Sequence, residues 1–157
     1  MGEGKTLPPF YLDKHKRLLK LLREFRDNEE GYGVVLAEFE RFLNLEEESL
    51  KYRAMAFDVM RTAALENPRD LRYEPYIRKL VERLLSYDDI KDKLVADFEF
   101  LFGEYFYLEH IYPISLIFWR ALERLGAKDS MERIKREILS SNVGEWIKRA
   151  EDLGILP

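Results

Sequence analysis

The sequence predicts an all-α protein, and three observations support that prediction. Apolar residues recur at the three- and four-residue spacings of amphipathic helices. Prolines and glycines fall between these stretches, where helices begin and end. Asn or Asp followed three residues later by Glu, the spacing of a capping box, precedes several of the stretches. We expect about eight helices in antiparallel pairs, with well over half of the residues helical and no sheet.

The first predicted helix starts at Pro8-Pro9 and runs to about Asp27. One face carries an apolar stripe with helical spacing, formed by Leu18, Leu21, Leu22 and Phe25. Gly31 and Gly33 are predicted to break the chain before a short second helix. The apolar residues of the second helix are Val35, Leu36, Phe39, Phe42 and Leu43.

The third helix is predicted from a capping box at Asn44 and Glu47 to about Glu66, where Asn67-Pro68 ends it. Its apolar stripe is Leu50, Met55, Val59 and Met60. Pro75 in a first turn predicts the start of the fourth helix. The residues expected to point inward from this helix are Ile77, Leu80, Val81, Leu84 and Leu85.

Four more helices are predicted in the C-terminal half. Asp88-Asp89 should cap the fifth, whose stripe is Leu94, Phe98, Leu101, Phe102 and Tyr105. A hairpin centred on Gly103-Glu104 is the alternative there, since aromatic residues alternate around it. The last three helices are expected to start at Pro113, at an Asp129–Glu132 box and at an Asn142–Glu145 box. Gly126 and Gly154 should end the sixth and the eighth.

A weak internal repeat relates the third and fourth helices to the fifth and sixth at one constant offset. Phe57 aligns with Phe98, and the run at 81–84 aligns with 122–125. A period of roughly 40 residues, with two helices per unit, resembles HEAT or armadillo arrays. Chance similarity between two amphipathic helix pairs is the alternative, and it would leave an irregular helical bundle.

Composition sets the class and the expected environment. Residues 1–8 are expected to be a flexible leader, followed by one domain over residues 9–157. The chain has no glutamine, no cysteine, four asparagines and 36% charged residues, which predicts a protein from a hyperthermophile. No apolar stretch is long enough to span a membrane, and the N-terminus has no apolar signal core, so we expect a cytoplasmic protein.

Few residues suit catalysis or a cofactor. Two histidines and no cysteine leave too few ligands for a common zinc or di-iron site, so no cofactor is expected. Glu109 and His110 beside Tyr112 form the one cluster suited to acid–base work. Neighbouring residues on a helix diverge by about 100°, which makes a capping or surface role for His110 the stronger interpretation. An enzyme centred on this cluster stays a third hypothesis.

Aromatic residues concentrate between Phe98 and Trp119, and this concentration motivates the leading hypothesis. One helix cannot bury every side unless it is central, so either this helix is packed on all sides or some of these rings form an exposed patch that would mark a binding site. The candidate partner-binding residues are Phe100, Tyr107 and Tyr112. The sequence therefore favours a non-enzymatic interaction or scaffold module that holds a protein partner or a copy of itself.

The first helix is basic, and it motivates the second hypothesis. Residues 1–26 carry a net charge of +4, while residues 27–58 carry −6. Lys16, Lys20 and Arg23 are candidate anion-binding residues, and they could serve a nucleic-acid-associated module. Further basic residues that could join them are Arg69, Arg72, Arg78, Lys79 and Arg83. Neutralisation by the neighbouring acidic stretch is the favoured alternative, because compositions of this kind build surface ion-pair networks.

Overall fold

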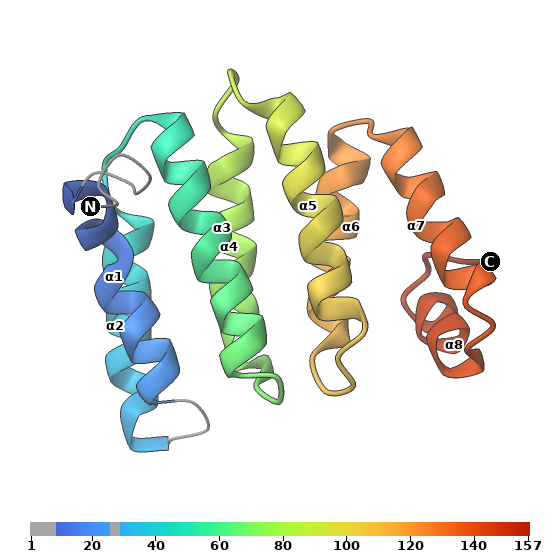
Figure 1. Ribbon diagram of the computed structural model, residues 1–157, viewed down its shortest axis with the longest axis horizontal. Coiled ribbons are helices and arrows are strands. Elements are labelled where there is room, and N and C mark those ends of the chain that lie inside the picture. The colour runs from blue at the N-terminus through green and yellow to red at the C-terminus, as the bar shows by residue number, and fades with distance from the viewer. Residues whose placement is uncertain (1–8, 26–28) are drawn as a thin grey trace, which may run out of the picture. The chain divides into compact units, whose positions relative to one another are not determined.

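The computed structural model describes residues 9–25 and 29–157, with the side chains of the first helix described from His15 onward (Figure 1). The predicted leader at residues 1–8 lies outside the described residues. Within the described ranges the regular structure is helical throughout, which confirms the all-α prediction. The α helices are α1 (Pro9–Glu24), α2 (Glu29–Leu43), α3 (Ser49–Glu66), α4 (Glu74–Leu85), α5 (Lys91–Phe106), α6 (Ser115–Arg124), α7 (Lys128–Ser140) and α8 (Gly144–Asp152). Two 3-10 helices, η2 (Leu71–Tyr73) and η3 (Tyr112–Ile114), precede α4 and α6.

Backbone contacts divide the chain into two compact units, Met1–Asn67 and Pro68–Pro157. Each unit has its own helix packing, and each is described separately. The expectation of a single domain over residues 9–157 stays a prediction.

In the first unit, α1 packs against both α2 and α3. The predicted stripe of α1 is buried at Leu18, Leu21 and Leu22. Phe42 of α2 stacks on Tyr52 of α3 with ring centroids 4.9 Å apart, and the Tyr52 hydroxyl donates to the Phe42 carbonyl at 2.9 Å. This contact connects α3 to the C-terminal end of α2.

The two glycines predicted to break the chain lie inside α2 instead. Gly31 is buried, and a Cβ at this position would overlap the Phe25 side chain. Gly33 is exposed and has open space around it. A helix-interior glycine costs only about 1 kcal/mol relative to alanine. Packing against Phe25 and the acidic first turn at Glu29 and Glu30 therefore outweigh the glycine signal.

The predicted side-chain caps were wrong. The residues before α3, α5, α7 and α8 are Glu48, Ile90, Ala127 and Val143, and none of them makes a side-chain cap hydrogen bond. Asn44 closes α2 instead, because its Nδ2 donates to the Glu40 carbonyl at 3.0 Å. Asn142 adopts a φ of 59° just after α7, the left-handed conformation common where helices end. Asn and Asp are favoured both where one helix ends and where the next helix begins. Their spacing alone therefore does not show which of the two helices they cap.

In the second unit, α5 and α6 run side by side, joined by residues 107–114 (Figure 1). The predicted stripe of α5 is confirmed, because Leu94, Phe98, Leu101, Phe102 and Tyr105 are all buried. Aromatic rings connect the two helices: Phe98 lies 5.9 Å and Tyr105 5.5 Å from Phe118, and Phe102 lies 6.1 Å from Trp119. The helical prediction for this stretch is therefore correct and the alternative hairpin is wrong.

Two of the predicted helix ends are confirmed by their backbone geometry. Gly126 and Gly154 have φ values of 66° and 79°. After α6, the Ala127 amide donates to the Leu122 carbonyl at 3.0 Å, and after α8 the Ile155 amide donates to the Ala150 carbonyl at 2.8 Å. These are the long-range bonds of Schellman caps, in which glycine tolerates the left-handed turn.

The HEAT-like repeat stays a prediction, although some element boundaries share the spacing that motivated it. Leu71 and Tyr112 begin η2 and η3, and Glu74 and Ser115 begin α4 and α6, so both pairs of boundaries keep the offset that relates Phe57 to Phe98. Part of the buried faces of α4 and α6 also agrees at this offset: Ile77 corresponds to the buried Phe118, whereas the buried Leu85 corresponds to the exposed Gly126. The buried faces of α3 and α5 match only when the offset is one position longer. Ala56, rather than the half-buried Phe57, then corresponds to Phe98, so that detail of the predicted alignment was wrong.

Candidate interaction groove

A hollow of about 530 Å³ lies between α5 and α7, both in the second unit. Nine residues line it: Ala96, Glu99, Phe100, Phe102, Gly103, Glu104, Tyr107, Ile134 and Glu137. We call this feature the α5/α7 groove. It brings together two of the three residues predicted to bind a partner, Phe100 and Tyr107.

The groove follows from the helical periodicity of α5. Its buried stripe faces α6, and residues 100, 103, 104 and 107 therefore share the other side at three- and four-residue spacings. Phe102 and Ile134 are buried and form the floor, while Phe100 is 48% exposed at the edge. A binding role for this half-exposed ring stays a prediction.

Gly103 is one of several groove residues that sequence reasoning missed. It lies within α5, where glycine is unfavourable by about 1 kcal/mol relative to alanine. A Cβ at Gly103 would meet only Tyr107 Cε2, at 3.9 Å, an ordinary contact distance. Packing therefore does not require glycine here, unlike at Gly31. The signal available in the sequence was a glycine inside an amphipathic stretch.

Carboxylates surround the apolar floor. Glu99 accepts hydrogen bonds from Ser130 Oγ at 2.6 Å and from Arg133 at 2.8 and 3.1 Å. The hydrogen bond from Arg133 holds the pKa of Glu99 below its usual value, so this carboxylate is ionised at neutral pH. Glu137 accepts from the Tyr107 hydroxyl at 3.1 Å, a neutral partner that leaves its charge in place.

Tyr107 is held in position by contacts within the second unit. Its ring meets Trp146 edge-on at 4.6 Å and Phe106 at 5.1 Å. Burial, together with the charge of Glu137, raises the pKa of the Tyr107 phenol above its usual value. The neighbouring Phe106 is fully buried. Truncation of Tyr107 would therefore disturb packing as well as the groove, and Phe100 is the cleaner residue to mutate.

Tyr112, the third predicted partner-binding residue, lies outside the groove. The Arg149 guanidinium lies over its ring in a cation–π contact, with Cζ 5.0 Å from the ring centroid. Arg149 is 6% exposed and donates to the Phe106 carbonyl at 2.9 Å and to Glu145 at 2.8 Å. Tyr112 therefore contributes to the attachment of α8 to the end of α5.

The basic face of α1 is exposed, and its role in binding anions stays a prediction. Lys16, Lys20 and Arg23 are all exposed, and Lys20 lies 4.0 Å from Glu24. The acidic stretch neutralises part of the helix through Glu38, which pairs with Arg17 at 3.1 Å. The same Glu38 also pairs with Arg41.

The two histidines have different environments. His15 is 1% exposed, and its Nε2 lies 3.5 Å from the Asp58 carboxylate of α3. Sequence reasoning did not predict this burial, although His15 lies three residues before Leu18, on the same face of the helix. His110 is exposed in the turn between α5 and η3, with its Nε2 3.9 Å from Glu109 and 3.4 Å from Arg69. An exposed pair at that separation gives no enclosed site for acid–base catalysis.

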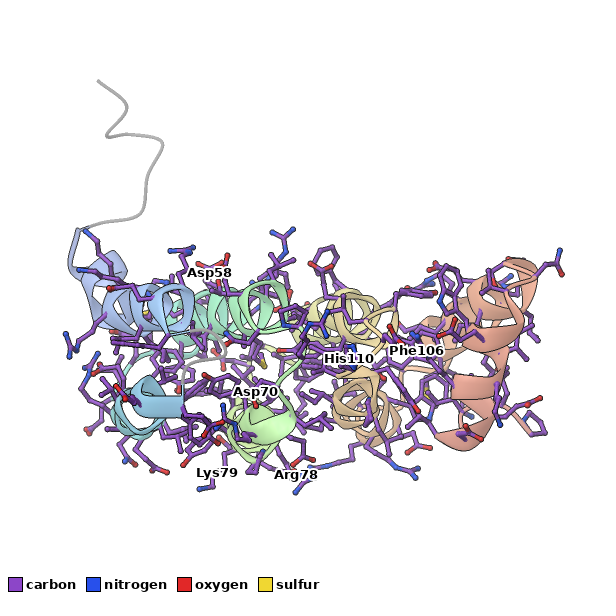
Figure 2. All side chains as sticks on the ribbon, turned by 90° about the horizontal axis from the view of Figure 1, so that it is seen from below. Asp58, Asp70, Arg78, Lys79, Phe106 and His110 are labelled. Atoms are coloured by element: carbon purple, nitrogen blue, oxygen red, sulfur yellow. The ribbon has the colours of Figure 1, made fainter. Side chains whose placement is uncertain are left out.

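A second hollow, of about 210 Å³, lies between α4 and α6. Its apolar floor includes Val81 and Ile117. Three arginines stand around it, and each pairs with a glutamate: Arg78 with Glu74, Arg120 with Glu123 at 2.9 Å, and Arg124 with Glu82 at 2.5 Å. Figure 2 shows Arg78 and Lys79 pointing outward from α4.

The described residues contain no group of three or more acidic or histidine side chains placed to hold a metal ion. None of the described helices combines the length and the apolar character that crossing a bilayer requires.

No family model matches this sequence, and no curated protein or solved structure is significantly similar to it. The function is therefore argued from the residues of the chain itself.

Proposed function

We propose that this protein is a non-enzymatic interaction module that binds a protein partner in the α5/α7 groove. One observation carries the proposal: an apolar hollow of about 530 Å³ keeps a half-exposed phenylalanine and a helix-interior glycine at its surface. Burying the exposed half of the Phe100 side chain would gain on the order of 1 kcal/mol. An exposed aromatic ring forgoes the stability gained by burial and a glycine inside a helix lowers stability, and residues of this kind are typical of functional sites.

The architecture suits this role. Paired helices that repeat at roughly 40 residues, as in HEAT arrays, bury one face each and present the other to ligands. The equal spacing of η2–α4 and η3–α6 supports a HEAT-like relationship for this part of the chain. We propose a hyperthermophile as the source of the module, because its composition is rich in charge and lacks glutamine and cysteine.

The two rival functions have weaker physical support. A nucleic-acid-associated module would use exposed cations, yet those of α4 are engaged within the chain: Arg78 with Glu74, Arg83 with the Tyr87 hydroxyl, and Lys79 over the Tyr76 ring. Lys16, Lys20 and Arg23 remain as the anion-binding candidates. An enzyme would need Glu109 and His110 in an enclosed cleft, and both side chains are exposed.

The proposal can be tested by mutating the exposed ring. Phe100→Ser removes the apolar edge of the groove, and Leu139→Ser is a matched control, since Leu139 is 51% exposed on α7 and does not line it. Tagged wild-type protein and both variants would be used for affinity capture from the source cells, with quantitative mass spectrometry. We expect a protein captured by the wild type and by Leu139→Ser to be lost with Phe100→Ser.

Equal capture by all three proteins would contradict a role for the groove. Capture of nucleic acid that declines steeply with salt, and that depends on Lys16, Lys20 and Arg23, would favour the nucleic-acid alternative.

A further inference from the structure

We infer that the occupant of the α5/α7 groove is a basic segment of another protein, which places lysine or arginine side chains on the carboxylates and an apolar side chain on Phe100. This inference rests on the proposed function and adds the chemistry of the partner. Three features of the groove support it: its charge, its rings and its glycine.

The charge of the groove is one-sided. The residues that line it include Glu99, Glu104 and Glu137 and no lysine, arginine or histidine. Arg133, which does not line the groove, donates a hydrogen bond to Glu99. Glu137 accepts a hydrogen bond from a neutral group, the Tyr107 phenol. A cationic side chain entering here gains a favourable interaction with the carboxylates, and an anionic one is repelled. Phosphate groups are disfavoured for the same reason.

The rings complement a long basic side chain. Phe100 lies three residues before Gly103 and Tyr107 four residues after it, so both rings line the groove from the same side of α5. Lysine and arginine have apolar stems that cover aromatic surface while the charged group reaches a carboxylate. A guanidinium or ammonium group over an aromatic face gains about 0.5–1 kcal/mol at an exposed site.

Gly103 gives a bound chain close access to the α5 backbone. It lies between the acidic and the aromatic residues, and a side chain there would extend into the hollow rather than into the core. Glycine is used where a ligand or another backbone approaches closely. The position therefore suits a peptide that crosses α5 at this point.

The basic helix of a second copy fits less well. The apolar residues of α1, such as Leu18 and Leu22, are buried within their own unit, so they are not available to cover Phe100. The occupant is therefore assigned to a different protein.

The test uses peptides selected by the full chain. A displayed library of random peptides would be selected on the wild-type protein, and selected peptides would be synthesised and measured by fluorescence anisotropy. We expect them to carry two or more basic residues around an aromatic or aliphatic one. The double variant Glu104→Gln, Glu137→Gln should raise the Kd by about tenfold or more, and salt should weaken wild-type binding.

Two glycine variants separate occlusion of the groove from unfolding. Gly103→Leu should abolish binding by filling the hollow, while Gly33→Leu, at an exposed glycine of α2 with open space around it, should leave binding unchanged. Circular dichroism of each variant reports its folding. A folded Gly103→Leu variant that binds the selected peptides as the wild type does would overturn the inference.

The outcomes also distinguish the inference from the proposed function. Selected peptides that are neutral or acidic, yet lose binding with Phe100→Ser, would refute the basic partner and retain the groove as a binding site. A selection that enriches no peptide, or peptides unaffected by Phe100→Ser, would count against both.

Discussion

Among individual residues, three helix-interior glycines have different structural roles. Gly31 is required by the close approach of Phe25, while Gly33 and Gly103 have room for a methyl group. This difference decides whether replacing each glycine by alanine raises or lowers the free energy of unfolding. Where the helix can accept alanine, glycine lowers stability through its greater freedom in the unfolded chain.

We therefore expect Gly103→Ala and Gly33→Ala to raise the free energy of unfolding by about 0.5–1 kcal/mol each. Gly31→Ala should lower it by more than about 1 kcal/mol, because the new Cβ overlaps Phe25. Urea denaturation of the three variants would measure these changes. A loss of stability in Gly103→Ala would show that packing, rather than access, explains that glycine.

A second prediction for single residues concerns two tyrosines, one in α5 and one at its end. Burial raises the pKa of Tyr105 and of Tyr107 above the usual value of 10.0, with further contributions from Glu104 and Glu137. Because the folded state favours the neutral phenols, this stabilisation is complete below pH 10 and is lost as the pH rises through the raised pKa values. Phenolate absorbance should show both groups still protonated at pH 10.0, the usual pKa.

The single variants Tyr105→Phe and Tyr107→Phe test separately whether each tyrosine contributes to the phenolate absorbance. Removal of either phenol should leave the absorbance change at pH 10.0 unaltered, since neither ionises there in the folded protein. A decrease in that change would mean that the missing tyrosine titrates normally.

Between helices, the contacts of single side chains hold one element to the next. Arg149 of α8 donates to the Phe106 carbonyl at the end of α5 and stacks on Tyr112. The planar guanidinium provides several donors in a fixed arrangement, which a lysine ammonium does not reproduce. The carbonyl it reaches belongs to a helix end, where backbone acceptors lack partners within the helix.

Arg149→Lys is therefore expected to lower the free energy of unfolding by about 1–3 kcal/mol. Lys148→Arg is the control, since Lys148 is exposed on the same helix and lies 3.9 Å from Asp152. Thermal and urea denaturation would compare the two variants. Equal stability of Arg149→Lys and the wild type would show that α8 is attached by its apolar residues alone.

Across the chain as a whole, charged residues connect helices that are distant in sequence. Arg17 of α1 pairs with Glu38 of α2, Arg124 of α6 with Glu82 of α4, and Arg133 of α7 with Glu99 of α5. Isolated exposed pairs contribute little at room temperature. Networks of them become more favourable as temperature rises, because the cost of removing charges from water falls.

We expect a midpoint of thermal unfolding above about 90 °C, as in other hyperstable proteins. The composition motivates this expectation, since the chain lacks glutamine and cysteine and is 36% charged. Calorimetry under pressure would measure the midpoint. A value of about 45–65 °C, the usual range for proteins from mesophiles, would contradict the assignment to a hyperthermophile.

The fold class and most of the apolar faces follow from the sequence alone. The stripes of α4 and α5 and the ends at Asn67, Gly126 and Gly154 were all predicted correctly. These features are local: the helical period shows which side of a helix is apolar, and glycine or proline shows where it stops.

What covers each face depends on tertiary packing. Gly31 stays in a helix because Phe25 packs there, Phe106 is buried, and Phe100 remains exposed beside α7. The α5/α7 groove has the same origin, since it joins Gly103 to Ile134 and Glu137 from a helix much later in the chain. Helical periodicity shows which side of a helix is apolar but not which distant helix packs on it, and that choice creates the candidate site.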